Sequence, residues 1–258
     1  MVLFGGNELK TKLYLIAFLV ALITVFSCLS AGSDARSTFG GVIVRKLPVY
    51  SVDRSDKKIA ITFDCAWGVE HTDEIIDAAN RYGVKCTFFA VQFWTERYPE
   101  YIKKLDENGI EIGTHSKTHP HMSTLSEKEI REELSSSAAA IEKITGKKVT
   151  LFRAPFGDYN DALITVAEDM GLKTIQWDVD SLDWKDLSAA EIAARIVKRV
   201  KSGSIILCHN NGKYTAAALP IVFSDLKDKG YEFVTVSELL LSGDTTIDNN
   251  GMQKYVKK

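Results

Sequence analysis

From residue 57 onwards the chain repeats one pattern, in which a polar, helix-like stretch ends in glycine and a short β-rich run follows. Glycine just past a helix end readily takes the left-handed conformation, so each joint indicates a turn from helix to strand. The six joints are RYG-VKCTFFAV, ENG-IEIGT, ITG-KKVTLF, DMG-LKTIQW, KSG-SIILCH and DKG-YEFVTV. With IAITFD in front of them, they predict seven strands that alternate with helices.

Two of the segments between these strands begin with a recognisable helix cap. SEKEIREELSSSAAAIEKI and SAAEIAARIVKRV each open with a serine that is followed three residues later by a glutamate, which is a capping box. Strict alternation of helices with short hydrophobic strands implies an α/β fold with a parallel sheet. Seven such repeats could close into a barrel or stay open and doubly wound, and periodicity alone does not decide between the two.

The composition suits one sizeable globular domain with extra segments at its ends. The chain has 258 residues, of which 45% are hydrophobic and 26% are charged, and its net charge is −2. This near-neutral balance offers no basic face for nucleic acid. We expect a linker and lead-in strand over 34–56, the α/β domain over 57–241, and a flexible, polar tail over 242–258.

The N-terminal segment has a different character. Residues 13–33, LYLIAFLVALITVFSCLSAGS, carry no charge, and Lys10 and Lys12 precede them. A helix of this length spans roughly 30 Å, about one hydrocarbon core. We therefore expect residues 1–33 to form a cytoplasmic tip and single-pass signal anchor, or a signal peptide cleaved near Ser30 or Ala31. Either alternative places the remaining chain outside the cell membrane, as an anchored or a secreted domain.

The chemically interesting residues follow the predicted strands. Asp64 ends the first strand, HSKTH follows the third, RAPFGD the fourth and WDVDSLDW the fifth, and His209 ends the sixth. In parallel α/β folds the active site lies at the carboxyl ends of the strands. The chain has five histidines, and His115, His119 and His209 all stand at such ends. Histidines four residues apart on one turn can hold one divalent cation, so His115 and His119 are candidate metal ligands.

The five motifs TFD, HSKTH, RAPFG, DSLDW and IILCH, in this order and at these spacings, resemble those of the polysaccharide deacetylases, the NodB-homology group of carbohydrate esterase family 4. The resemblance covers about residues 57–241 and implies a distorted (β/α)7 barrel. It also implies metal-assisted hydrolysis of an N-acetyl group on an amino sugar of a polysaccharide. The AWG after TFDC and the N-terminal apolar segment resemble the membrane-anchored branch found in spore-forming bacteria.

The resemblance also assigns roles to individual residues. It makes Asp64 the general base that takes a proton from water, held in place by Arg153 through a charge-assisted pair. It makes His209 the general acid that protonates the leaving amine, oriented and kept charged by Asp183.

Further roles follow from the same motifs. His115 and His119 match the metal ligands of the family, and the metal would polarise the acetyl carbonyl and acidify a bound water. The backbone N–H of Phe156 would help to stabilise the oxyanion. Trp184 and Leu207 match the apolar walls around the acetyl methyl group, and ordinary core packing is the alternative for both.

The chain departs from the family pattern at position 65. There the base is usually followed by a second aspartate that ligates the metal, whereas this chain has Cys65. Three alternatives stay open: the Cys65 thiolate is the third ligand, a carboxylate of Glu70 or Asp73 replaces it, or water fills the position. The thiol could also simply pack in the core. A sulfur ligand would favour zinc over manganese or magnesium, and cobalt or nickel are further alternatives.

Three functions from different classes are consistent with the sequence. The first is an extracytoplasmic, metal-dependent polysaccharide N-deacetylase, with peptidoglycan as the favoured substrate and chitin-type oligomers or an exopolysaccharide as alternatives. The second is a catalytically weak or inactive homologue that binds cell-wall carbohydrate. The third is a thiol-dependent protein built on Cys65, for which Cys208 is the one candidate partner; Cys86 and Cys208 otherwise look like small buried hydrophobic residues.

Overall fold

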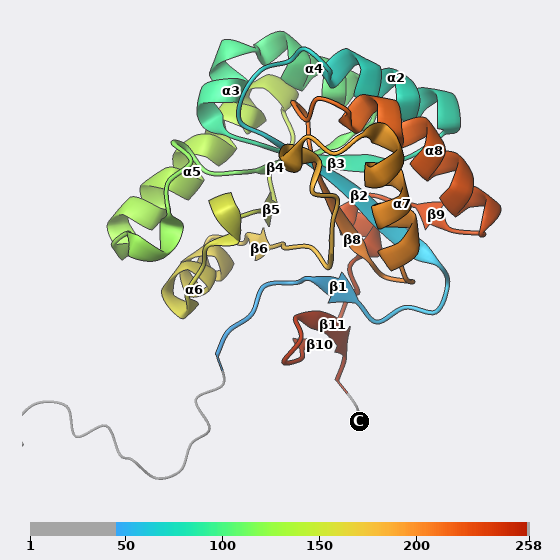
Figure 1. The fold of residues 1–258 in the computed structure, drawn as a ribbon. Helices are drawn as coiled ribbons and strands as arrows, with labels where there is room; N and C mark the ends of the chain where they lie inside the picture. The colour runs from blue at the N-terminus through green and yellow to red at the C-terminus, as the bar shows by residue number, and fades with distance from the viewer. Residues whose placement is uncertain (1–44, 257–258) are drawn as a thin grey trace, which may run out of the picture. The chain divides into compact units, whose positions relative to one another are not determined.

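In a computed structural model, which describes residues 45–256, a curled sheet is flanked by helices (Figure 1). The strands are β1 (Ser51–Val52), β2 (Lys58–Cys65), β3 (Cys86–Ala90), β4 (Glu111–Thr114), β5 (Leu151–Phe152), β6 (Lys173–Thr174), β7 (Val179–Asp180), β8 (Ile205–His209), β9 (Glu232–Phe233), β10 (Thr245–Ile247) and β11 (Met252–Tyr255). The helices are α2 (Thr72–Tyr82), α3 (Gln92–Arg97), α4 (Pro99–Glu107), α5 (Glu127–Thr145), α6 (Asp161–Asp169), α7 (Ala189–Arg199), α8 (Thr215–Asp228) and α9 (Val236–Leu239), with 3-10 turns η1 (Met122–Thr124), η2 (Pro155–Gly157) and η3 (Asp183–Lys185).

The main sheet is parallel, as the alternation of helices and strands predicts. Its strand order is β6-β5-β4-β3-β2-β8-β7, and β9 pairs with the beginning of β2. Each of the seven predicted strands is present, and the short β7 is an addition. Within residues 45–256, β6 and β7 are the two ends of this order and do not pair with each other. The sheet is therefore a curled, incompletely closed one, consistent with a distorted (β/α)7 barrel.

The predicted helix boundaries have the expected chemistry. Ser126 and Ser188 each accept a hydrogen bond from the backbone N–H of the third residue of their helix, and the glutamate there bonds back, so both capping boxes are confirmed. Helices α2 and α5 end at Gly83 and Gly146, whose φ angles are 57° and 68°. These left-handed residues stop each helix and turn the chain towards the next strand.

The two faces of β2 have different surroundings. Ile59, Ile61, Phe63 and Cys65 belong to the large hydrophobic core between the sheet and the helices. Ala60 belongs instead to a smaller cluster that also contains Phe89 and Ile205. Because successive side chains of a strand point to opposite faces, Thr62 and Asp64 share the face of Ala60. Strand β2 therefore presents Asp64 on the inner side of the curled sheet.

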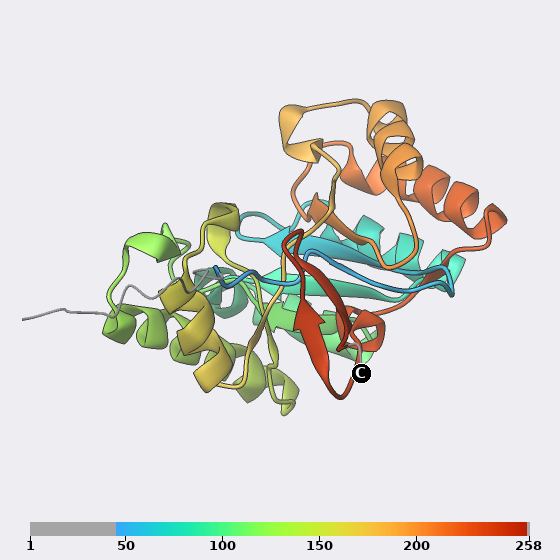
Figure 2. The same cartoon turned by 90° about the horizontal axis from the view of Figure 1, so that it is seen from below.

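The C-terminal segment forms regular structure in place of the expected flexible tail. Strands β10 and β11 pair antiparallel, and β11 pairs in parallel with β1 (Figure 2). The buried side chain of Gln253 fixes this hairpin, since it exchanges hydrogen bonds with the backbone N–H and C=O of Leu241. The segment just before β1 forms a bridge to Ile175 beside β6, and Ser51 forms one to Ser204 beside β8. The tail is thus a part of the domain up to residue 256.

The expected membrane segment, residues 13–33, lies outside the described residues, as does the first part of the expected linker. Among the helices of residues 45–256, none is long and apolar enough to cross a membrane.

Candidate active site

Asp64 stands at the carboxyl end of β2 and is held by a buried arginine. Arg153, which follows β5, donates from Nη1 to Asp64 Oδ1 at 2.8 Å and to Thr62 Oγ1 at 2.7 Å. The Arg153 side chain is fully buried and that of Asp64 is 8% exposed. Burial alone would raise the pKa of Asp64, but the charge of Arg153, with His115 and His209 nearby, lowers it below the ordinary value. The carboxylate is therefore ionised at neutral pH.

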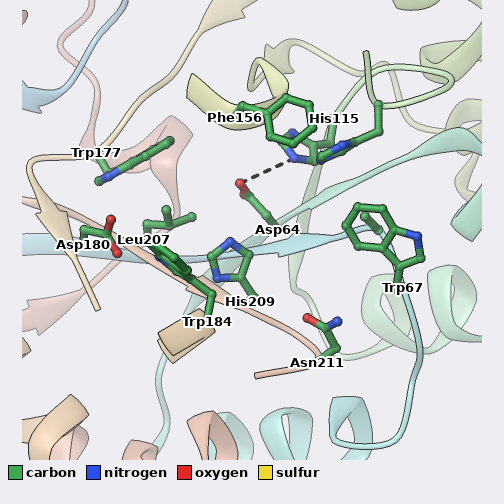
Figure 3. Close-up of a pocket in the computed structure, with 12 residues that line it drawn as sticks. Asp64, Trp67, His115, Phe156, Trp177, Asp180, Trp184, Leu207, His209 and Asn211 are labelled. Carbon is green, nitrogen blue, oxygen red and sulfur yellow. Dashed lines mark ion pairs between the residues drawn. The ribbon is translucent and has the colours of Figure 1, made fainter. Parts of the chain in front are cut away.

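Of the two histidines of HSKTH, His115 lies beside Asp64 (Figure 3), and His119 lines the same pocket. His115 Nδ1 donates to the carbonyl of Arg153 at 2.8 Å, so the lone pair of the neutral ring is on Nε2, which lies 3.6 Å from Asp64 Oδ2. The ring of His119 lies 5.0 Å from that of His115. Burial lowers the pKa of both rings, and for His119 the neighbouring His115 helps to lower it to about 4. Both imidazoles are thus neutral, which is the form that binds a metal ion.

The loop that carries these histidines is fixed by Glu133 of α5. This buried carboxylate accepts hydrogen bonds from the backbone N–H groups of Lys117 and Thr118, both at 2.8 Å, and from the Thr118 hydroxyl at 2.7 Å. Ser116 and His119 have φ angles of 77° and 59°, which few non-glycine residues adopt. Glu133 therefore holds a loop whose backbone is strained at both of these positions.

His209 faces Asp64 from the neighbouring strand β8. Its Nδ1 donates to Asp183 Oδ1 at 2.7 Å, and Asp183 Oδ2 accepts from the backbone N–H of His209 and from the Thr215 hydroxyl. Burial alone would lower the pKa of His209, but the bond and charge of Asp183, with Asp64 and Asp180 nearby, raise it above its ordinary value. The geometry leaves Nε2, on the opposite side of the ring, to exchange a proton in the pocket.

Phe156 occupies the turn η2 with a left-handed backbone, at φ 60°. Its ring is stacked on His121 at a centroid distance of 4.4 Å and meets His119 edge-on at 4.6 Å. A bulky side chain in this region of φ is strained, and such strain occurs most often where a site needs the backbone in one orientation. The turn brings Phe156 beside His119 and His121. The family resemblance implies that the backbone N–H of Phe156 stabilises the oxyanion.

These residues surround one pocket of about 520 Å³, a size typical of small-molecule sites. Asp64, His115, His119 and His209 line it together with the predicted Phe156, Trp184 and Leu207. Arg153 and Asp183 lie buried behind the residues they hold. The sequence reasoning did not single out five other lining residues, which are Ala66, Trp67, Trp177, Asp180 and Asn211. All five stand within or directly beside the motifs at the strand ends, and this position in the sequence is the signal from which they could have been predicted.

Cys65 is not among the lining residues. It is fully buried in the core on the helix side of β2, with Sγ 3.9 Å from the carbonyl of Phe63. Burial raises the pKa of its thiol well above the ordinary value, which disfavours the thiolate that binds metals. Cys65 and Cys208 are both free in the structure. The alternation along β2 therefore directs the thiol away from the side chain of Asp64.

The carboxylates considered in place of Cys65 are also outside the pocket lining. Asp73 pairs with Lys104 at 2.6 Å, and Glu70 lies beside Gly68. Within residues 45–256, no group of three or more His, Cys, Asp or Glu side chains is arranged to hold a metal ion. The neutral rings of His115 and His119 fit two ligand positions, so a metal bound here needs further ligands from water or substrate.

The family model for polysaccharide deacetylases matches residues 51–175. The peptidoglycan-N-acetylglucosamine deacetylase of Bacillus cereus is 36% identical over 196 residues, which are 74% of this chain and 92% of that protein. The chain belongs to the polysaccharide deacetylase family. An uncharacterised protein of Bacillus subtilis and a peptidoglycan-N-acetylglucosamine deacetylase of Listeria monocytogenes are 32% and 35% identical over 75% of this chain. The chain spans 60% and 41% of the lengths of these two relatives.

Solved structures of the family include proteins with and without activity. A CE4 family pseudoenzyme from Bacillus anthracis superposes with a TM-score of 0.73 at 33% identity, covering 75% of this chain and 68% of that chain. A mutant of such a pseudoenzyme with restored enzymatic activity has the same TM-score at 34% identity. The fold therefore occurs in active and in inactive proteins, so whether a member of the family is active depends on the residues of its site.

Proposed function

We propose that this chain is a metal-dependent N-deacetylase that hydrolyses N-acetyl groups on the amino sugars of peptidoglycan. The observation that carries the proposal is the pairing of Asp64 and His209 in one pocket. The pKa of the carboxyl group is lowered and that of the imidazole is raised, so at neutral pH a base and an acid face each other. Named peptidoglycan deacetylases among the relatives support the choice of substrate.

In this proposal the reaction is the hydrolysis of an acetamide. Asp64 removes a proton from a water molecule, whose oxygen attacks the acetyl carbonyl carbon. Arg153 keeps Asp64 ionised and oriented, and the N–H of Phe156 donates to the carbonyl oxygen as it gains charge. His209 gives its proton to the sugar nitrogen as the C–N bond breaks. The products are acetate and a glycan that carries a free amine.

His115 and His119 are the residues that would hold a divalent cation. When bound, such a cation polarises the carbonyl group and acidifies water. Imidazole ligands suit zinc and nickel, and zinc is our choice, with manganese, cobalt and nickel as alternatives. Because Cys65 lies in the core, we expect weaker metal binding than in relatives that have a third protein ligand.

The location of the enzyme is a further part of the proposal. The uncharged run of residues 13–33, preceded by lysines, supports a domain that lies outside the cell membrane, either anchored or released by cleavage. A peptidoglycan substrate is accessible on that side.

A second candidate function is a cell-wall carbohydrate-binding protein with feeble or no turnover. It is favoured by Cys65 at the position of the usual aspartate ligand and by the resemblance to a CE4 pseudoenzyme. Against it, the pairs Asp64–Arg153 and His209–Asp183 are both formed.

Two measurements on the same preparations distinguish the two functions. The first is the metal content of the wild-type protein beside His115→Ala and Cys65→Ala, and the second is acetate release from N-acetylated glycan with and without added zinc. If the protein is a deacetylase, wild type should hold about one metal ion and release acetate, and His115→Ala should lose the metal ion. Absence of bound metal and of acetate across several glycans would contradict it and favour the binding protein.

A further inference from the structure

An exposed aromatic surface adjoins the pocket on the side of His119. Trp67, in the loop after β2, lines the pocket and is 57% exposed, and Phe93 of α3 is 37% exposed. Their ring centroids are 6.3 Å apart, and the ring centroids of Trp67 and His119 are 5.0 Å apart in a T-shaped arrangement. Phe93 is not a lining residue, so the apolar surface continues from the pocket onto the outside of the domain. We name these two rings the Trp67–Phe93 shelf.

The exposure of Trp67 does not come from a loosely held loop. The carbonyl of Gly68 accepts hydrogen bonds from Trp94 Nε1 at 2.7 Å and from Asn210 Nδ2 at 2.9 Å. Both donors are fully buried, and Asn210 directly follows His209. Gly68 itself has a φ of 66°, a left-handed conformation that favours glycine. The loop is thus fixed to the strand that carries His209, with its tryptophan facing solvent.

Trp67 keeps more than half of its surface exposed although its loop is fixed, so a ligand that covered the ring would bury further apolar area. Contiguous apolar surface beside a polar pocket is typical of a binding site. The exposed rings of Trp67 and Phe93, whose planes are inclined by 46° to each other, suit a ligand with a C–H-rich side and polar edges. A pyranose ring has this shape.

The position of the shelf indicates which sugar it would contact. Trp177, Trp184 and Leu207 lie across Asp64 from Trp67 (Figure 3). A sugar whose acetamide reaches Asp64 occupies the space between these two sides, and the shelf continues outwards past it. We propose that the Trp67–Phe93 shelf binds the pyranose ring adjacent to the sugar being deacetylated, so that the site selects glycan chains over single sugars. This inference rests on the proposed function for the identity of its ligand.

The test uses β-1,4-linked oligomers of N-acetylglucosamine with one to five sugars as probes. Their affinities are measured by calorimetry after chelator treatment, and kcat/KM for acetate release is measured with zinc. For wild type we expect a disaccharide to bind about tenfold more tightly than the monosaccharide, which corresponds to about 1.4 kcal/mol. Trp67→Ala should lose most of this tenfold preference for the disaccharide, and Trp67→Phe should retain part of it. Tyr255 of β11 is an aromatic residue that is 58% exposed, so Tyr255→Ala is the matched control and should leave the preference for the disaccharide unchanged.

The outcomes separate this inference from the proposed function. A Trp67→Ala variant that loses affinity equally for one sugar and for several would show that Trp67 acts on the pocket or on His119, and the inference would fail. Wild-type affinity that does not depend on length would also overturn it. Length-dependent binding that requires Trp67, without any acetate release, would support the shelf and refute the deacetylase.

Discussion

Replacing Arg153 by methionine is a strong test of how Asp64 is kept ionised. Methionine has a similar length and is apolar, so it fills much of the same space without supplying a charge. The pair is shielded from water, with side-chain exposures of 0% for Arg153 and 8% for Asp64. Removing one partner of a buried ion pair leaves an uncompensated charge and typically costs about 3–5 kcal/mol. We expect Arg153→Met to lower the free energy of unfolding by this amount.

The cost has a characteristic dependence on pH. In wild type the lowered pKa of Asp64 contributes stability at pH values above the unfolded-state pKa, and this contribution is lost on acidification. Without Arg153, burial raises the pKa of Asp64, so the carboxyl group takes up a proton more readily in the folded state. The difference in stability between wild type and Arg153→Met should therefore be largest at neutral pH and shrink towards pH ~4, near the ordinary pKa of aspartate.

Urea denaturation followed by tryptophan fluorescence measures this difference. The double variant Asp64→Asn with Arg153→Met removes the buried charge, so it should recover most of the loss seen in Arg153→Met alone. Surface ion pairs contribute only about 0–1 kcal/mol. A loss of less than about 1 kcal/mol in Arg153→Met, or a loss that Asp64→Asn does not relieve, would refute the reasoning that Asp64 is a buried anion held by Arg153.

Three further variants test other parts of the site. Asp183→Asn removes the charge that raises the pKa of His209, so the alkaline limb of the pH profile of kcat/KM should move to lower pH; an unmoved limb would speak against His209 as the acid. Cys65→Ala should keep the metal content of wild type and cost about 1 kcal/mol of stability, because the thiol lies in the core; loss of metal would restore Cys65 as a ligand. Glu133→Gln weakens the acceptor that fixes the loop of His119, and zinc affinity measured by competition with a chelator should fall about tenfold; an unchanged affinity would assign Glu133 a purely structural role.

Much of the fold could be predicted because its signals are local. Helices that end in glycine and short buried strands are each specified within a few residues, and the parallel sheet follows from their alternation. The constellation of Asp64, His115, His119 and His209 then follows, because parallel strands bring their carboxyl ends to one edge. The C-terminal hairpin could not be anticipated in this way. Its partner β1 is roughly two hundred residues away, and neither strand has a strong hydrophobic pattern of its own.

Other features depend on which way a side chain points. The direction of Cys65 was accessible from the sequence, since it directly follows Asp64 in a strand and alternate residues face opposite sides. By contrast, Trp177 lies in the irregular connection between β6 and β7, and Asp180 ends the two-residue strand β7, so no periodicity determines which side chains face the pocket there. The same holds for Trp67, whose position is set by hydrogen bonds to Gly68 from two distant elements.

The central claim is the hydrolysis of N-acetyl groups, and the most direct measurement counts both products. Purified protein supplied with zinc is incubated with N-acetylated peptidoglycan glycan, and acetate and new primary amines are quantified together. The account predicts one acetate for each new amine, no release by Asp64→Asn, and a rate about 10²–10⁴-fold lower in His209→Gln. Absence of acetate from zinc-loaded wild type, or equal release by wild type and Asp64→Asn, would contradict it.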